Sequence, residues 1–228
     1  MLPETIKLLL PVQPLAAHEG KLKPGDSVLE PIRVSDREHS SAIEILARAF
    51  TGDPMVKYVA GEKAKQYVNK IYGVMFRAYS TKGYAYFDSP RMNGMILWID
   101  SGEDPGLGAW IRGGALKMLP FPAGSLGRLM KVGRGVSKVH KECIKEHHLH
   151  LIFIAVSPAS QGKGIGRQLM SLLTHEADSK ALPCYLETQN PSNLRFYESF
   201  GFYVAKEIEI SPELRSWSMV RPVPPRER

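Results

Sequence analysis

Hydrophobic positions follow two different periods along this chain, and the changes of period outline its elements. Residues 28–34 predict a first strand, with Pro31 at an edge or a bulge. Ser35 and Glu38 have the spacing of a capping box, and apolar residues at helical spacing follow as far as Phe50. The chain therefore opens with a strand and an amphipathic helix.

The middle of the chain predicts a second helix, a hairpin and a segment of different character. Gly52-Asp53-Pro54 should end the first helix, and residues 61–80 should form the second. Residues 84–87 and 95–99 are short apolar stretches on either side of a turn, which indicates an antiparallel hairpin. Residues 101–147 contain many Gly and Pro residues and two helix-like stretches, so we expect a helical insertion there.

The last third alternates between strand and helix patterns. A strand over residues 148–156 leads through a Gly-rich loop into a helix with an apolar stripe, and residues 183–188 predict the next strand. Asn190-Pro191 should begin a short helix that ends at Gly201. Two closing strands are expected at residues 202–210 and 216–220.

Composition narrows the class of protein. Of the 228 residues, 43% are hydrophobic and 23% are charged, which is typical of a globular domain. The apolar runs are too short to span a bilayer, and Pro11 and Pro14 interrupt the N-terminal one, so we expect neither a membrane partner nor a signal peptide. Two cysteines, Cys143 and Cys184, are too few for a disulfide framework, which indicates a reducing, cytoplasmic compartment.

The formal net charge of +7 favours anionic ligands without naming one. The basic residues form no continuous run and do not alternate with aromatic residues, so we expect no nucleic-acid partner. From Trp110 through Lys141 there are seven Lys or Arg residues, Lys141 included, and no Asp or Glu. That stretch is interpreted either as a solvated helical face or as a substrate lid with a basic surface.

The Gly-rich loop at residues 158–166 carries the main chemical signal. It follows a strand and opens a helix, which places free backbone N–H groups and the positive helix end at one spot, as phosphate sites require. A P-loop would need Ser or Thr after Lys163, where this chain has Gly164. A dinucleotide fingerprint would need its third Gly one position after Gly166. The spacing fits neither motif.

Two motifs resemble the GNAT superfamily of N-acetyltransferases. Gln161-x-x-Gly164-x-Gly166, after Ala155-Val156-x-Pro158, is similar to that family's acetyl-CoA signature. Residues 193–202 resemble its Asn-x-x-x-Tyr-x-x-x-Gly-Phe segment. The two motifs span residues 148–204, and the long Phe-Ile-Ala-Val-x-Pro form with the helical insertion is similar to puromycin-acetyltransferase-like members.

The resemblance implies a fold and a domain plan. We expect one α/β GNAT-like domain with a mixed, mainly antiparallel central sheet flanked by helices, two splayed parallel strands and a helical insertion. The acetyltransferase domain should cover residues 27–220, with the insertion at 101–147. Residues 1–26 would be an N-terminal extension, and residues 221–228 a flexible tail.

The resemblance also implies where acetyl-CoA binds. The strand segment Ile154, Ala155 and Val156 would contact it, with the backbone of Ile154 and Val156 pairing with the pantetheine arm and the Val156 amide donating to the acetyl oxygen. Asn193 would touch the arm, and Tyr197 would bind the cofactor and protonate the leaving thiolate. The pyrophosphate would lie on the loop and helix start, formed by Gln161, Gly162, Lys163, Gly164, Ile165, Gly166 and Arg167.

The general base is left open between two residues. His150 lies three residues before Phe153, where histone-acetylating members of the family have a Glu, and histidine titrates near neutrality. Glu187 on the neighbouring strand is the competitor. Strand alternation would place one set of residues on the same face: His148, His150, Ile152, Ile154 and Val156. A metal held by the neighbouring histidines is not expected, because adjacent strand residues point in opposite directions.

Three functions follow from these expectations. The leading one is acetyl-CoA-dependent acetylation of a small-molecule primary amine by direct attack, with Tyr197 as general acid. The alternatives are a protein or peptide N-acetyltransferase and a non-catalytic acyl-CoA-binding module. The expected assembly is a monomer or a homodimer.

Overall fold

One seven-stranded sheet runs through the protein. The computed structural model describes residues 31–118 and 121–225. The strands are β1 (Ile32–Arg33), β2 (Tyr84–Phe87), β3 (Gly94–Asp100), β4 (Leu149–Val156), β5 (Cys184–Thr188), β6 (Tyr203–Ser211) and β7 (Leu214–Arg221). They lie in the order β1-β2-β3-β4-β5-β7-β6, and β4–β5 is the parallel pair. All the other neighbouring strands are antiparallel.

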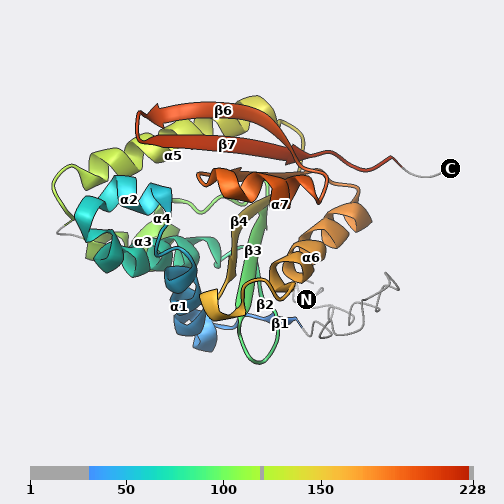
Figure 1. Cartoon of the computed structure of the whole chain (residues 1–228), viewed down its shortest axis with the longest axis horizontal. Helices are drawn as coiled ribbons and strands as arrows, with labels where there is room; N and C mark the ends of the chain where they lie inside the picture. Colours follow the sequence, from blue (N-terminus) through green and yellow to red (C-terminus); the bar gives the residue numbers. More distant parts are fainter. Residues whose placement is uncertain (1–30, 119–120, 226–228) are drawn as a thin grey trace, which may run out of the picture.

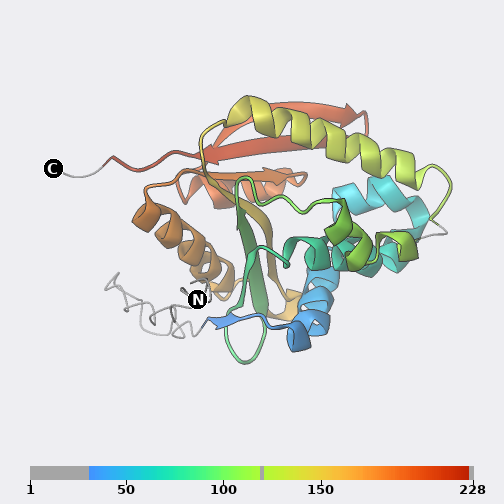
Figure 2. The same ribbon diagram turned by 180° about the vertical axis from the view of Figure 1, so that it is seen from behind.

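Helices cover both faces of the sheet. They are α1 (His39–Ala49), α2 (Pro54–Ala60), α3 (Ala64–Tyr79), α4 (Leu107–Gly113), α5 (Ser125–Cys143), α6 (Ile165–Lys180) and α7 (Leu194–Glu198). Helices α1 and α3 pack on one face and α6 packs on the other (Figure 1). Helix α5 lies along β6 and β7 (Figure 2). Helices α4 and α5 lie in the segment between β3 and β4, where the sequence predicts two helix-like stretches.

Local sequence signals explain most of these elements. The Glu38 carboxylate accepts hydrogen bonds from the backbone N and the Oγ of Ser35 at 2.8 and 2.9 Å, so the predicted capping contact forms. The predicted hairpin is β2–β3, in which Tyr84 faces Trp98 and Phe87 faces Met95. The predicted first strand is reduced to β1, and its residues 28–30 lie outside the described part of the chain.

Helix α2 was not predicted. Gly52-Asp53-Pro54 was interpreted only as a break, yet Pro54 is the first residue of a new helix. Asp53 caps that helix, because its Oδ1 accepts from the backbone N of Val56 at 3.1 Å. Proline is well suited to the first helical position, since no helical hydrogen bond needs its missing N–H. The same three residues therefore end one helix and begin the next.

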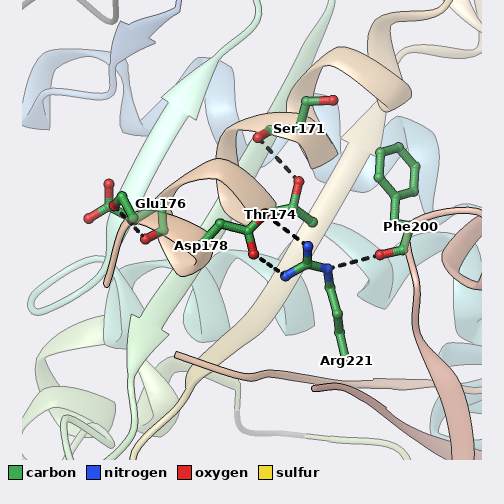
Figure 3. Close-up of polar contacts among 7 residues, drawn as sticks. Ser171, Thr174, Glu176, Asp178, Phe200 and Arg221 are labelled. Atoms are coloured by element: carbon green, nitrogen blue, oxygen red, sulfur yellow. Dashed lines mark hydrogen bonds and ion pairs between the residues drawn. The ribbon is translucent and has the colours of Figure 1, made fainter. Parts of the chain in front are cut away.

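The end of β7 corrects the predicted C-terminal tail. Arg221 belongs to the strand, and its side chain is buried. Its guanidinium donates to both carboxylate oxygens of Asp178 at 2.7 and 2.9 Å and to the Phe200 carbonyl at 2.9 Å (Figure 3). A two-point bond of this kind fixes geometry as well as adding energy, so it fastens β7 to α6. Residues 226–228 and the expected extension over residues 1–26 lie outside the described ranges.

The expected fold class is confirmed. The chain forms one α/β domain whose sheet is antiparallel apart from β4–β5, with helices on both faces. None of the described helices has both the length and the apolar character needed to cross a membrane.

Candidate active site

The parallel strands β4 and β5 diverge, as predicted. They pair at only three positions, from Leu149 opposite Cys184 to Leu151 opposite Leu186. Beyond that point Glu187 and Thr188 of β5 still pair with β7, whereas β4 continues to Val156 along β3 alone. A gap therefore opens between two strands that are neighbours at their starts.

A bulge in β4 corrects the predicted strand faces. Leu97 of β3 pairs with Phe153, but the next residue, Trp98, pairs with Leu151, so Ile152 is an extra residue. An extra residue reverses the alternation of side chains beyond it. Ile154 and Val156 consequently pack on the α6 face, whereas His150 points to the opposite face, toward α5. The prediction that these residues share one face is wrong for this reason.

The backbone of β4 faces the gap at alternate residues. Ser157 N donates to the Asn93 carbonyl at 2.7 Å, which fixes the hydrogen-bonding phase of the β3–β4 ladder. Groups of an antiparallel pair alternate between facing the partner and facing away, so Ile154 and Val156 direct their N–H and C=O into the gap. The Val156 carbonyl accepts from Gln161 Nε2 at 3.2 Å, in agreement with that direction. Ala155 instead directs its backbone toward β3.

The Gly-rich loop connects β4 to α6 (Figure 1). Gly162 and Gly164 have φ values of 77° and 83°, a conformation that strongly favours glycine, and the space above both Cα atoms is open. The first helical bond runs from Gln168 N to the Gly164 carbonyl, so the amides of residues 165–167 have no acceptor within the helix. Open space over unpaired amides at a helix N-terminus fits a phosphate group.

The loop's side chains lie around this opening. Lys163 and Arg167 are exposed, and the Arg167 guanidinium lies over the Phe200 ring, 5.4 Å from its centroid. Ile165 is buried under the loop as the first residue of α6. Gly166 faces α7 and the end of β4, where an added Cβ would come within 3.7 Å of the Phe196 ring. Two cations are thus available near the amides without blocking them.

Helix α7 places the second motif at the gap. Asn190 caps the preceding turn by accepting from Ser192 N at 3.1 Å, as predicted. Asn193 and Tyr197, one helical turn apart, both line the same cavity as Ile154 and Val156. The Tyr197 side chain is buried, and burial raises the pKa of its phenol above the usual value, so the hydroxyl keeps its proton at neutral pH.

The two candidate bases form a pair. His150 Nε2 lies 2.8 Å from Glu187 Oε2, and their side chains are 8% and 12% exposed. Burial alone would raise the pKa of the Glu187 carboxyl, but His150, together with His140 and Tyr185, outweighs that effect and holds the pKa below its usual value. A carboxylate only accepts hydrogen bonds, so Nε2–H is the donor. His150 Nδ1 is buried and has no hydrogen-bond partner among the described residues.

A second histidine pair lies beside the first and was not predicted. His140 of α5 and His148 join through their Nε2 atoms at 2.7 Å, and His148 Nδ1 lies 2.7 Å from the Glu146 carbonyl. The His140 ring stacks on Tyr185 at 4.0 Å and lies 4.7 Å from the His150 ring. Burial lowers the pKa of His140 to about 4, so it is neutral at pH 7.

The strand histidines do not converge on a common point. His147 contacts Ser101 and Asp100, His148 contacts His140, and His150 contacts Glu187. Each ring therefore has different partners. Among the residues that the structure describes, no group of His, Cys, Asp or Glu side chains is arranged to hold a metal ion.

One cavity of about 970 Å³ connects these parts. At one end it is lined by the ends of β4 and β5 and by α7, and at the other by side chains of α1, α3, α4 and α5. The His150–Glu187 pair lies on its wall between the two. The substrate-lid interpretation placed residues 101–147 at the acceptor, but it named none of their lining residues, including His140. The spacing of Val132, Val136 and His140 was a usable signal, because these residues occupy one face of an otherwise basic helix.

Comparison with known proteins gives a consistent result. An uncharacterized N-acetyltransferase of Schizosaccharomyces pombe is 26% identical over 189 residues, covering 78% of this chain and 76% of that protein. A mycothiol acetyltransferase of Thermomonospora curvata is 32% identical over 124 residues, covering 49% of this chain and 38% of that protein.

Solved structures agree on the fold. A crystal structure of "histone acetyltransferase HPA2 and related acetyltransferase" from Corynebacterium glutamicum superposes with a TM-score of 0.63 at 15% identity, covering 88% of this chain and 99% of the other. Residues 81–202, more than half of the 228, match the family described as "Acetyltransferase (GNAT) family". With the diverging strands and the Gly-rich loop in place, this match shows that the chain belongs to the GNAT acetyltransferase family.

Proposed function

We propose that this protein is an acetyl-CoA-dependent N-acetyltransferase that acetylates a primary amine of a small molecule by direct transfer. The observation that carries the proposal is a shared cavity. It is lined by the gap-facing strand residues Ile154 and Val156, by Tyr197 and by the buried His150–Glu187 pair. Acetyl-CoA, when bound, supplies an activated thioester carbonyl and a thiol leaving group.

In this proposal acetyl-CoA binds at the end of the cavity formed by β4, β5 and α7, the cofactor end, and it is held mainly by backbone groups. The amides of Gly162 to Arg167 hold the pyrophosphate, and Lys163 and Arg167 add positive charge. Ile154 and Val156 both offer an amide in the gap. One can pair with the pantetheine arm while the other stabilises the acetyl oxygen, the role expected of Val156. Gln161 already bonds the Val156 carbonyl, which fixes the loop against the strand. Asn193 lies beside the arm.

Proton transfer is assigned to the two buried side-chain groups. An amine that arrives as ammonium must lose a proton before it can attack. Glu187 accepts Nε2–H of His150 and both residues line the cavity, so the carboxylate–imidazole pair acts as one general base that takes up that proton. Tyr197 stays protonated because of its burial, and it donates to the leaving sulfur.

The helical end of the cavity, which would receive the acceptor and is the acceptor end from here on, supports a small acceptor rather than a peptide. Side chains of four helices, α1, α3, α4 and α5, surround that end of the cavity, which supports a small acceptor. The resemblance to puromycin-acetyltransferase-like members likewise leads to the hypothesis that the acceptor is a small molecule. The free thiols Cys143 and Cys184 agree with the proposed reducing, cytoplasmic compartment.

The test measures acetyl-CoA binding and turnover separately. Calorimetry reports acetyl-CoA affinity, and release of the CoA thiol is followed with a panel of small amines and with peptides. The proposal expects binding and thiol release with at least one small amine, with an acetylated product of the matching mass. Release with peptides alone would identify a protein acetyltransferase. Tight binding without release for any acceptor would identify a binding module.

A further inference from the structure

The acceptor end of the cavity differs in charge from the rest of the protein. The chain has 30 Lys and Arg residues and a net charge of +7. Among the described residues that line the cavity there is no Lys or Arg, whereas three carboxylates, Asp53, Asp104 and Glu187, do line it. The basic residues of α5 point elsewhere, while Val132 and Val136 of that helix face inward. The interior is therefore selective against anions although the surface is basic.

Aromatic and sulfur-containing side chains form most of the remaining wall. The edge of the Tyr79 ring meets Trp110, with 5.6 Å between the ring centroids. Trp110 Nε1 donates to the Pro105 carbonyl at 3.1 Å, which uses the only polar atom of the indole. Other members of the wall are Phe50, Tyr72, Phe121, Met55, Met75 and Met118. Such surfaces bind apolar and aromatic bodies, and methionine adapts to their shape.

No histidine of the cavity offers an unpaired positive charge. His140 is neutral at pH 7, because burial and the nearby His150 lower its pKa to about 4. His150 is held by Glu187 at 2.8 Å. An acceptor carboxylate placed here would be buried without a cation and near Glu187, which is strongly unfavourable.

A second cationic group on the acceptor would also lack a partner. Of the two lining carboxylates away from β4 and β5, Asp53 is the more buried. It already accepts hydrogen bonds from Val56 N at 3.1 Å and from the Tyr72 hydroxyl. Burial raises the pKa of Asp53, so its environment does not favour charge. Asp104 is exposed to solvent, where it attracts cations only weakly.

We propose that the acceptor is a monoamine with an apolar, aromatic body and without an anionic group. This inference rests on the proposed function, because it places the acceptor amine at His150–Glu187. The ring then lies between Tyr79, Trp110 and the inner face of α5. The buried Glu187 carboxylate lies at the amine and disfavours an anionic group. Among the described residues, no buried carboxylate is free near the ring, so a second amine would have no buried partner.

The experiment compares compounds that differ in one group. Phenethylamine and phenylalanine differ only by a carboxylate, and putrescine replaces the ring with a second amine. We expect kcat/KM for phenethylamine to exceed that for phenylalanine by at least about 100-fold, because an unpaired buried carboxylate costs several kcal/mol. A preference over putrescine of at least about 10-fold is expected from the apolar contact area. Equal or reversed preferences would overturn the inference and leave the acetyltransferase proposal intact.

Binding without turnover separates the two proposals. Calorimetry with CoA-saturated protein measures the affinity of the same three compounds directly. If no amine releases thiol but phenethylamine still binds most tightly, the proposed function fails and the ligand class stands. If the three compounds bind alike, the ligand class is wrong whatever the turnover.

A charge placed in the wall should change the preference. Val136→Lys puts a cation on the inner face of α5, and it should lower the phenethylamine-to-phenylalanine ratio by about 10-fold or more by pairing with the carboxylate. Met130→Lys adds the same charge to the same helix at a position that is 47% exposed and outside the cavity lining. That control should keep the wild-type ratio. A shift of the ratio in Met130→Lys as large as in Val136→Lys would contradict recognition by the wall.

Discussion

The two ends of the cavity are built in different ways. The cofactor end uses backbone groups from one short stretch, in which β4, the Gly-rich loop and the start of α6 follow one another between Leu149 and Arg167. The acceptor end uses side chains that come from α1, α3, α4 and α5, which are spread over more than ninety residues of sequence. The first surface is polar and repetitive, and the second is largely apolar and irregular.

This difference determines what each end tolerates. A backbone site depends on φ values and on open space, so most side chains in the loop can change while Gly162 and Gly164 cannot. A side-chain site can be remodelled one residue at a time without moving the sheet. The acceptor can therefore differ between proteins that share this fold and loop, since specificity lies in the part that is free to vary.

The strongest test of the side-chain end removes the carboxylate beside His150. Glu187→Gln keeps a hydrogen-bond acceptor but no longer holds the negative charge that supports the base. We expect the single-turnover acetylation rate at pH 7 to fall about 10³-fold, with acetyl-CoA affinity unchanged. Glu176→Gln is the control, because that carboxylate is on the surface of α6 and pairs with Lys180. A wild-type rate in Glu187→Gln would exclude the pair from the mechanism.

Tyr197 lies where the two ends meet, and its hydroxyl is the next test. Tyr197→Phe keeps the buried ring and removes only the proton donor. We expect a fall of about 10²-fold in the single-turnover rate and little change in acetyl-CoA affinity. Single-turnover kinetics are needed because slow product release can hide a slower chemical step. If the rate stays at the wild-type value across pH, another proton donor acts and Tyr197 only packs.

The backbone end is tested by paired substitutions at Gly164. Both Gly164→Ala and Gly164→Asp strain a residue with a φ of 83°, but only the second adds a negative charge at the loop. We expect acetyl-CoA affinity, measured by calorimetry, to fall about 10-fold in the first and at least about 50-fold in the second. The difference should shrink as salt is raised, since salt screens exposed charges. Equal losses in both variants would show that no phosphate binds at this loop.

The smallest expected effect concerns folding stability and pH. The pKa of His140 is about 4 in the folded protein, below the usual value of 6.5, so the unfolded chain binds more protons between these pH values. Stability should therefore fall as pH drops from about 6.5 toward 4, with His140 contributing about 1–2 kcal/mol of the loss. His140→Phe keeps an aromatic ring against Tyr185 and should reduce the pH dependence. Urea unfolding at pH 7 and pH 5 measures the difference, and an unchanged dependence would contradict a neutral, buried His140.

Sequence reasoning predicted the Gly-rich loop and the elements on either side of it almost completely, because their signals are local. Glycine φ requirements, the capping residues Ser35 and Asn190, and the start of α6 act within a few residues, and each leaves a readable pattern. Sequence reasoning failed where one local sequence is compatible with two different structures. Gly52-Asp53-Pro54 can end a helix or begin one, and only the packing of α2 between α3 and α5 distinguishes the two. The tail prediction failed at Arg221 because its partner, Asp178, is distant in sequence.

The sequence by itself determined the order of the elements apart from α2, the β2–β3 hairpin, the Gly-rich loop and the family, since all of these rest on patterns among near neighbours. Only the tertiary structure decided two further features. The bulge at Ile152 turned His150 away from Ile154, and the segment between β3 and β4 brought His140 and Trp110 to the cavity. Each depends on contacts between residues far apart in the chain, which no local period encodes, because the free energy of such contacts appears only when the elements pack together.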